Sequence, residues 1–395
     1  MLKNNKAITL IALVVTVIVL LILAGISISM LTGQNGILNR AHEAKEKTKI
    51  ANQDEQRKLA QAEALMNTEE TTYKGVTIPK GFAPTRVEGE DSVDAGLVIT
   101  DGKGNEFVWV EVPKTNTVYS TAGTNITNFT DEEYTKIETD LKTYTSEYKA
   151  DGYSDTNSNF TTQYRNMLKS VYTNGGFWIG RYEAGYEIDE SKGEKARNYN
   201  DDYYTEHPTT QRVVIKKNVY PYNWVRREQA QALAIGMDYE GCTSSLIFGV
   251  QWDLALKNIE TKFIEKNSSS DIKTKLTSNS TTIGNYNTNL CNITNANAKY
   301  SINSGNSFTT CPYQKIENVD VLLTTGADDS FSLTNIYDIA GNVWEWTLES
   351  FGADNCVFRG GSGHNTGLYG PAKDHGNVVN SYSFYTLGFR IGLWK

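Results

Sequence analysis

This chain of 395 residues contains four cysteines. They are candidates for chemistry because a thiolate can act as a nucleophile, a redox group or a metal ligand. They are Cys242, Cys291, Cys311 and Cys356. No two of them form a Cys-x-x-Cys pair, so their spacing is not that of a zinc site. In an oxidising compartment they could form two disulfides in any of three pairings, or they could remain free thiols, and the spacing does not decide between these alternatives.

Histidines offer no clearer site. Outside the N-terminal region the chain has His207, His364 and His375, which lack a metal-ligand spacing. No Ser/His/Asp arrangement and no phosphate-binding glycine loop stands out. The net charge of −8 and the absence of any Lys/Arg run give no support to nucleic-acid binding. The sequence therefore favours a binding protein over an enzyme with a familiar catalytic set.

A polar, tyrosine-rich segment over residues 363–386 is the best candidate for a binding surface. Tyrosine offers a large amphipathic contact area, and small polar residues add adaptable hydrogen bonds, as in antibody paratopes. The candidate ligand contacts are His364, Asn365, Tyr369, Asn380, Tyr382 and Phe384. Tyr382 and Phe384 could alternatively be core residues that lead into a following strand.

Three blocks near the C-terminus resemble, in their order, the formylglycine-generating enzyme or sulfatase-modifying-factor family. They are Ile-Tyr-Asp-Ile-Ala-Gly-Asn-Val-Trp-Glu-Trp at 336–346, Arg-Gly-Gly-Ser at 359–362 and Gly-Phe-Arg-Ile at 388–391. The resemblance implies an α+β, C-type-lectin-like domain. In that family two reactive cysteines occupy the third and eighth positions after the Arg-Gly-Gly-Ser block, where this chain has Asn365 and Gly370. The resemblance therefore implies the scaffold without the catalytic thiols.

The same resemblance implies a structural Ca²⁺ ion bound by Asp338, Gly341, Val343 and Glu345. Hard cations prefer carboxylate and carbonyl oxygens, which two side chains and two backbone groups could supply here. From spacing alone, Asp338 is better explained as a turn residue and Glu345 as a solvated strand residue. The resemblance also implies that Arg390 is a buried member of an ion pair.

Residues 363–386 also resemble the C-terminal variable region of proteins that retroelements diversify, which share the lectin-like fold and end in Gly-Phe-Arg. Adenine-directed mutation of Asn codons cannot produce Met, Gln, Lys, Glu or Trp. Only Lys373 in this segment belongs to that set, where average composition would supply about five such residues. The depletion is consistent with a variable binding region.

The N-terminus carries a second signal. Lys3 and Lys6 precede an uncharged run whose apolar part, residues 8–31, is long enough to cross a bilayer as a helix. Lysines on the N-terminal side orient such a span with its C-terminal side outside. A cleavable secretory signal is the alternative, since Ala24 and Gly25 offer small residues.

This start resembles that of a type IV prepilin, which implies cleavage between Ala7 and Ile8. Two residues depart from the family pattern. Ala7 stands where glycine is usual, and Ala12 stands where a glutamate normally pairs with a neighbouring subunit. A pilin-like or minor subunit, or a plain anchor, is therefore favoured over a major pilin.

The expected organisation has four parts: a leader-like segment 1–7, a membrane or pilin-like helix 8–31, a helical stalk and linker 32–72, and the lectin-like domain 73–395. The stalk helix is expected over residues 37–67, where good helix formers dominate. In the domain, Asp101-Gly-Lys-Gly104 predicts a β-hairpin. Helices are expected over 131–148, 227–235 and 249–263. Two Thr/Ser/Asn-rich stretches, 115–159 and 266–310, are expected to be surface insertions that are ordered only in part.

We therefore expect a membrane-anchored protein of the cell surface or pilus whose lectin-like domain binds a protein or glycan, as an adhesin does. Its expected partners are the membrane, through the N-terminal helix, that ligand, and other pilin subunits. Two alternatives remain open. One is an active oxidoreductase of the formylglycine-generating-enzyme and sulfoxide-synthase superfamily, and the other is a purely structural minor pilin.

Overall fold

A computed structural model of the protein describes residues 13–24, 36–156, 159–192, 194–198, 212–267, 270–303, 305 and 307–395. The chain divides into two compact units, Met1–Lys58 and Leu59–Lys395. Residues 13–24 are helical and lie within the expected membrane span. The rest of that span and the Ala7–Ile8 junction lie outside the described residues. Within the described ranges, no helix combines the length and the apolar character that a membrane crossing needs.

The four helices expected from local sequence are present with similar bounds, and the structure adds α4 (Thr161–Asn174) and α8 (Asp271–Thr277), which were not predicted from the sequence. The stalk helix is α2 (Ile37–Met66), and its last turns belong to the second unit, where Ala60 and Ala64 pack against Ala83. The predicted helix 227–235 is α6 (Arg227–Ile235). The other helices are α3 (Asp131–Tyr144), α4 (Thr161–Asn174), α7 (Gly249–Asn267) and α8 (Asp271–Thr277). Two 3-10 turns cover η1 (Glu190–Lys192) and η2 (Asp329–Phe331).

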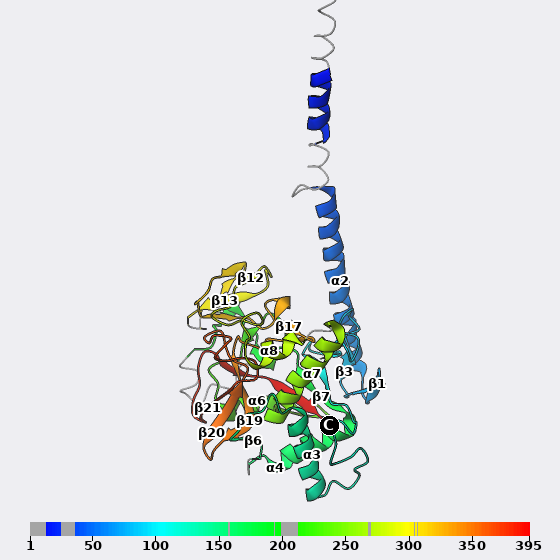
Figure 1. The fold of residues 1–395 in the computed structure, drawn as a ribbon, viewed down its shortest axis with the longest axis vertical. Helices are drawn as coiled ribbons and strands as arrows, with labels where there is room; N and C mark the ends of the chain where they lie inside the picture. Colours follow the sequence, from blue (N-terminus) through cyan, green and yellow to red (C-terminus); the bar gives the residue numbers. More distant parts are fainter. Residues whose placement is uncertain are drawn as a thin grey trace, which may run out of the picture. The chain divides into compact units, whose positions relative to one another are not determined.

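A six-stranded antiparallel sheet forms the main core of the second unit (Figure 1). In sheet order its strands are β11 (Thr243–Leu246), β23 (Ile391–Trp394), β7 (Gly176–Gly180), β5 (Glu106–Glu111), β4 (Val98–Asp101) and β3 (Phe82–Pro84). The β4–β5 pair is the predicted hairpin around Asp101-Gly-Lys-Gly104. Helix α4 packs on β7, and α7 packs on β5.

A second sheet brings the three C-terminal sequence blocks side by side. It contains β21 (His375–Val379), β20 (Asn355–Arg359), β19 (Trp344–Phe351) and β22 (Leu387–Phe389), and β6 (Tyr153–Ser154) pairs with the far end of β19. Glu345 on the central strand lies opposite Arg359 on one side and Gly388 on the other. Blocks separated by some 40 residues therefore meet within one row of the sheet.

Short strands form the remaining ladders. They are β1 (Thr71–Tyr73) with β2 (Val76–Ile78), β8 (Gly185–Tyr186) between β9 (Val213–Val214) and β10 (Tyr220–Pro221), β17 (Ser332–Leu333) with β18 (Ile336–Tyr337), β12 (Cys291–Ile293) with β15 (Tyr313–Lys315), and β13 (Lys299–Ile302) between β14 (Thr309–Thr310) and β16 (Val321–Leu323).

Much of what the structure describes in the two stretches 115–159 and 266–310 is packed, although both were expected to be ordered only in part. In 115–159, Ile137 and Leu141 of α3 are fully buried, and so is Tyr148. In 266–310, β12 and β13 (yellow in Figure 1) belong to a small second core that includes Ile293 and Ala298. Few apolar residues are enough to pack each stretch against a core, because they occur at positions that face one side of a helix or strand ladder. Low apolar content alone was therefore misleading.

Candidate functional site

The loop after β20 positions Asn365 and Gly370, the residues at which the sequence resemblance would place cysteines. Gly361 has a positive φ of 75°, and a Cβ there would lie 2.1 Å from the carbonyl oxygen of Gly370. Only glycine permits this close approach, which holds the two ends of the loop together. At the first thiol position, Asn365 Oδ1 accepts hydrogen bonds from Trp344 Nε1 at 2.8 Å and Ser362 Oγ at 2.7 Å. A Cβ on Gly370 would lie 3.4 Å from Asn365 Cβ, so these two positions are neighbours in space, and neither carries a thiol.

His364 and Phe384 belong to a surface of contacting rings. The His364 ring centroid lies 6.2 Å from that of Phe384, and His364 Nδ1 lies 2.5 Å from Asp320 Oδ2. Tyr385 Oη lies 3.3 Å from the same nitrogen. Tyr382 stacks beside Phe384 with 20° between the ring planes, and Trp224 meets Phe384 edge-on at 6.0 Å. We call the five residues of this surface the aromatic patch: Trp224, His364, Tyr382, Phe384 and Tyr385.

Exposure within the aromatic patch is uneven. Tyr382 is 41% exposed, whereas Phe384 is half-buried against the main core. Phe384 therefore combines both roles that the sequence left open for it, since one side of its ring packs and the other borders the surface. The backbone fixes this arrangement, because the N–H of Trp224 donates to the carbonyl oxygen of Phe384.

The other three candidate contacts lie elsewhere on the same segment. Tyr369 is 84% exposed and makes no ring contact within the described part of the chain. The side-chain oxygen of Asn365 accepts hydrogen bonds from Trp344 and Ser362, as described above. Asn380 donates to Glu228 of α6 and lies 3.7 Å from Cys356 Sγ. The structure thus joins His364, Tyr382 and Phe384 and leaves Asn365, Tyr369 and Asn380 outside the aromatic patch.

Sequence reasoning missed Trp224, Tyr385 and Asp320 at this surface. Tyr385 could have been found, because it continues the tyrosine-rich run. Trp224 and Asp320 could not, because each comes from a separate part of the chain and reaches the surface only through long-range packing.

The four predicted calcium ligands lie around a buried charged cluster. Both carboxylate oxygens of Glu345 accept hydrogen bonds from Arg390, the shortest at 2.6 Å. Asp338 Oδ2 accepts from the N–H of Gly326 at 2.7 Å, and Glu183 is a third buried carboxylate here. The predicted ion-pair role of Arg390 is confirmed. Trp346 is buried, whereas Trp344 is half-buried.

Burial dominates the electrostatics of this cluster. It raises the pKa of Asp338 to about 6, and it raises the pKa of Glu345 to about 7 despite the opposing charge of Arg390. The oxygen donors suit a hard cation chemically, but Arg390 already engages both Glu345 oxygens. Within the described ranges, no three His, Cys, Asp or Glu side chains are grouped to hold a metal ion. Calcium therefore stays a prediction.

The four cysteines are free thiols in environments that oppose reactivity. Burial raises the pKa of Cys242 to about 12 and that of Cys291 to about 11. Burial also raises the pKa of Cys311 and of Cys356. Nucleophilic cysteines need the opposite shift, because the thiolate is the reacting form.

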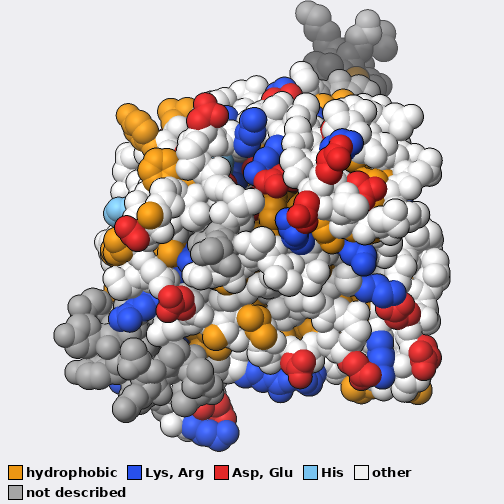
Figure 2. Space-filling model, turned by 90° about the horizontal axis from the view of Figure 1, so that it is seen from below, with side chains coloured by type: hydrophobic (Ala, Val, Ile, Leu, Met, Phe, Trp, Pro, Cys, Tyr) orange, Lys and Arg blue, Asp and Glu red, His pale blue; other side chains and the backbone are white. Residues whose placement is uncertain are grey.

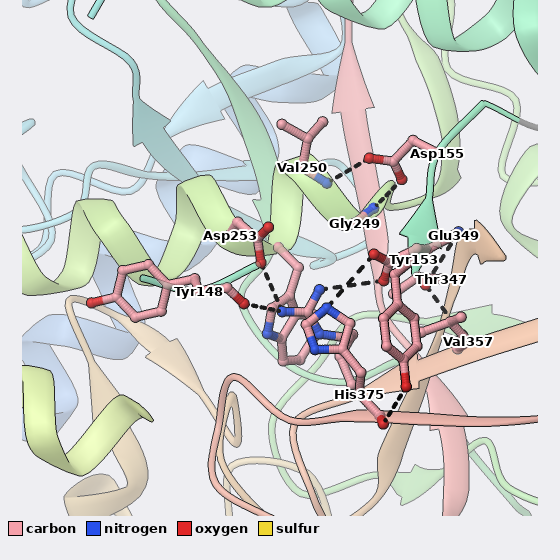
Figure 3. Close-up of polar contacts among 12 residues, drawn as sticks. Tyr148, Tyr153, Asp155, Gly249, Val250, Asp253, Thr347, Glu349, Val357 and His375 are labelled. Carbon is pink, nitrogen blue, oxygen red and sulfur yellow. Dashed lines mark hydrogen bonds and ion pairs between the residues drawn. The ribbon is translucent and has the colours of Figure 1, made fainter. Parts of the chain in front are cut away.

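A second polar cluster surrounds Arg359 of β20, and Figure 3 shows Asp253, Glu349 and His375 among its members. Arg359 Nη2 donates to Asp253 Oδ1 at 2.7 Å, and Nη1 lies 3.4 Å from Glu349 Oε2. The ring of His375 packs against that of Tyr153 with centroids 4.5 Å apart. Burial and the nearby Arg359 charge lower the pKa of His375 to about 2, so this histidine is neutral. His375 is therefore an interior residue and does not share the surface of His364.

The molecular face in Figure 2 carries acidic and basic side chains interspersed, without a field of one sign. Lys and Arg side chains therefore do not gather into a single basic patch on that face.

Comparison with known proteins places residues 250–392 in a family model described as a sulfatase-modifying factor enzyme 1-like domain. No curated protein matches the sequence. Among solved structures, the crystal structure of CarF is 14% identical, with 56% of this chain and 87% of that chain covered and a TM-score of 0.30. Treponema denticola variable protein 1 is 12% identical, with 82% and 98% covered and a TM-score of 0.23. These scores are too low to support any argument about function. The match covers α7 from Val250 onward, the strands β19 to β22 and all three C-terminal blocks, and it supports a formylglycine-generating-enzyme-like fold for residues 250–392.

Proposed function

We propose that the second unit is a ligand-binding domain that has kept the formylglycine-generating-enzyme scaffold without its catalysis. The observation that carries the proposal is the position and the hydrogen bonding of Asn365. It occupies the first thiol position, and its side-chain oxygen is held by Trp344 and Ser362. A carboxamide cannot act as the nucleophile or redox group that a thiol-based oxidase needs.

Two further features support binding. The aromatic patch offers rings and a His364–Asp320 pair at one surface, the combination of apolar area and polar handles that recognition surfaces favour. Tyr369 adds a highly exposed ring on the same segment, where a partner could reach it.

We further propose that the chain displays this domain at the cell surface or on a pilus, in the manner of an adhesin. The uncharged run at 8–31 after two lysines supports an anchor in the membrane or in a filament. The ligand is a protein or a glycan on another surface, and variation of residues 363–386 would let related chains bind different ligands. A structural Ca²⁺ ion at Asp338 and Glu345 is part of the same proposal.

Arrays of glycans and of purified surface proteins test the binding role, with the full chain as probe. Once a ligand is found, Tyr382→Ala should weaken its capture roughly tenfold to thirtyfold, because truncating an aromatic anchor typically costs 1.4–2 kcal/mol or more. Tyr134→Ala on α3, outside the aromatic patch, is the matched control and should bind normally.

Two outcomes would contradict the proposal. Turnover of a cysteine-containing peptide by the purified protein would favour the oxidoreductase alternative. Filament incorporation without capture of any ligand would favour the structural minor pilin.

A further inference from the structure

A polar cavity of about 180 Å³ lies beside the Arg359 cluster, apart from the aromatic patch. Its inner wall consists of Asp155, Val250, Asp253 and Glu349, and its mouth is formed by Lys142 and residues 149–153. Figure 3 shows Asp253 and Glu349 reaching toward each other from α7 and β19, with Asp155 next to the first turn of α7. A dry cavity of similar size can hold a molecule as large as benzene, so this one has room for a small ligand.

The carboxylates around this cavity outnumber the positively charged side chains near them. Arg359 is shared by Asp253 and Glu349, which are both buried. The ammonium group of Lys142 lies 2.5 Å from the carboxylate of Glu138 and forms an ion pair with it. Asp155, also buried, accepts hydrogen bonds from the N–H groups of Gly249 and Val250, and among the described residues its carboxylate forms no ion pair. Lys149 and Asp151 also line the cavity, so five carboxylates (Glu138, Asp151, Asp155, Asp253 and Glu349) meet three cations (Lys142, Lys149 and Arg359), and buried negative charge without a counter-cation is costly.

Hydrogen-bonding capacity at the inner wall is unused as well. The Glu349 side chain is only 8% exposed, and its single carboxylate hydrogen bond within the described ranges is the 3.4 Å contact with Arg359. Asp253 has one such bond, at Oδ1, which leaves Oδ2 available. His375, whose side chain is 5% exposed, points Nε2 at Glu349 Oε1 across 3.6 Å, too far for a hydrogen bond, and that nitrogen has no hydrogen-bond partner among the residues that the structure describes. Such groups normally find partners, and here they point to a missing donor.

We infer that this cavity binds a small primary ammonium ion. An ammonium group carries three N–H donors and one positive charge, which would serve the open oxygens of Glu349 and Asp253 and offset the surplus of carboxylates. Val250 and the ring of Tyr153 offer apolar surface for a short aliphatic stem. An anion would meet an excess of like charge, and a metal ion would need a grouping of ligands that the described residues do not provide.

Titration of the purified full chain with n-butylammonium, followed by calorimetry and by thermal unfolding, tests the inference. Sodium chloride at equal ionic strength and n-butanol serve as comparison solutes. We expect saturable binding and a rise in the melting temperature with n-butylammonium alone, because a ligand that binds only the folded state stabilises it.

Three variants locate the effect. Glu349→Gln should weaken binding roughly tenfold to a hundredfold, since a charge-assisted hydrogen bond is lost. Ala150→Trp should abolish binding by filling the mouth while leaving the buried charges in place, so it remains informative if Glu349→Gln fails to fold. Glu147→Gln is the matched control, because that carboxylate pairs with Lys273 outside the cavity wall, and it should bind normally.

The inference is overturned if no saturable binding occurs, which would mean that only water fills the cavity. It is also overturned if n-butanol binds equally well, or if the response to n-butylammonium survives Ala150→Trp, since the ammonium would then act on exposed carboxylates elsewhere.

Discussion

Replacing Arg359 by methionine should be among the most damaging single changes in the second unit. Arg359 is fully buried and donates to the carboxylate of Asp253 at 2.7 Å, and it also reaches the backbone carbonyl oxygens of Tyr148, Lys373 and Asp374. Methionine keeps much of the side-chain volume but removes the charge and every donor. Breaking a buried ion pair from one side typically costs about 3–5 kcal/mol, because the remaining charge is left unpaired.

For a domain of this size the loss corresponds to a fall in melting temperature of roughly 6–10 °C, at about 2 °C per kcal/mol. Differential scanning calorimetry at neutral pH measures it. Arg165→Met is the control, since Arg165 pairs with Asp131 at an exposed position and such pairs contribute about 0–1 kcal/mol.

Charge removal provides a second check on the same reasoning. Adding Asp253→Asn and Glu349→Gln to Arg359→Met should recover part of the lost stability, because no unpaired carboxylate then remains beside the site. The argument is refuted if Arg359→Met melts like the unaltered protein, or if removing both carboxylates recovers nothing.

The remaining predictions concern pH, calcium and the anchor. Burial raises the pKa of Asp155 to about 7, so its protonated side chain should stabilise the fold at low pH. This contribution to the free energy of unfolding should be lost as the pH rises from about 4 to about 7. Asp155→Asn should flatten that part of a stability–pH curve measured by urea unfolding. If Ca²⁺ binds, a hundredfold excess over its Kd should stabilise the fold by about 2.7 kcal/mol, and both chelator and Glu345→Ala should remove that gain in a thermal melt. The protein should fractionate with membranes or sheared filaments because residues 8–31 are uncharged, and mass spectrometry of its N-terminus should find a methylated Ile8 if a prepilin peptidase acts; soluble full-length protein would contradict this.

Elements specified by local sequence were predictable. The turn glycines around Lys103 impose the β4–β5 hairpin, and the Ala/Gln-rich run of α6 begins and ends where its helix formers do. Helix α4 was missed because its Thr, Tyr and Asn residues have weak helix propensity, and burial of Tyr164, Met167 and Leu168 stabilises it instead. Tertiary packing therefore decided the element where propensity was poor.

The candidate site was likewise predictable only where local sequence specifies it. The absence of thiols after Ser362 could be read directly from the sequence, and the assignment of residues 363–386 as the binding segment stays a prediction. The membership of the aromatic patch was not, because Trp224 joins it through a backbone hydrogen bond to Phe384, 160 positions further along the chain. Nothing local to Asn380 predicts its bond to Glu228, which depends on how α6 packs against β19.

The place of β23 in the main sheet has a consequence for biosynthesis. This strand lies between β11 and β7, so the sheet remains split into two pieces until residues 391–394 are present. Folding of the second unit must therefore finish after the ribosome has made nearly all of it, and late, long-range pairing of this kind is slow and exposes apolar strands in the meantime. Nascent chains that stall before Ile391 should be recognised by chaperones or proteases and should not accumulate as partly working domains.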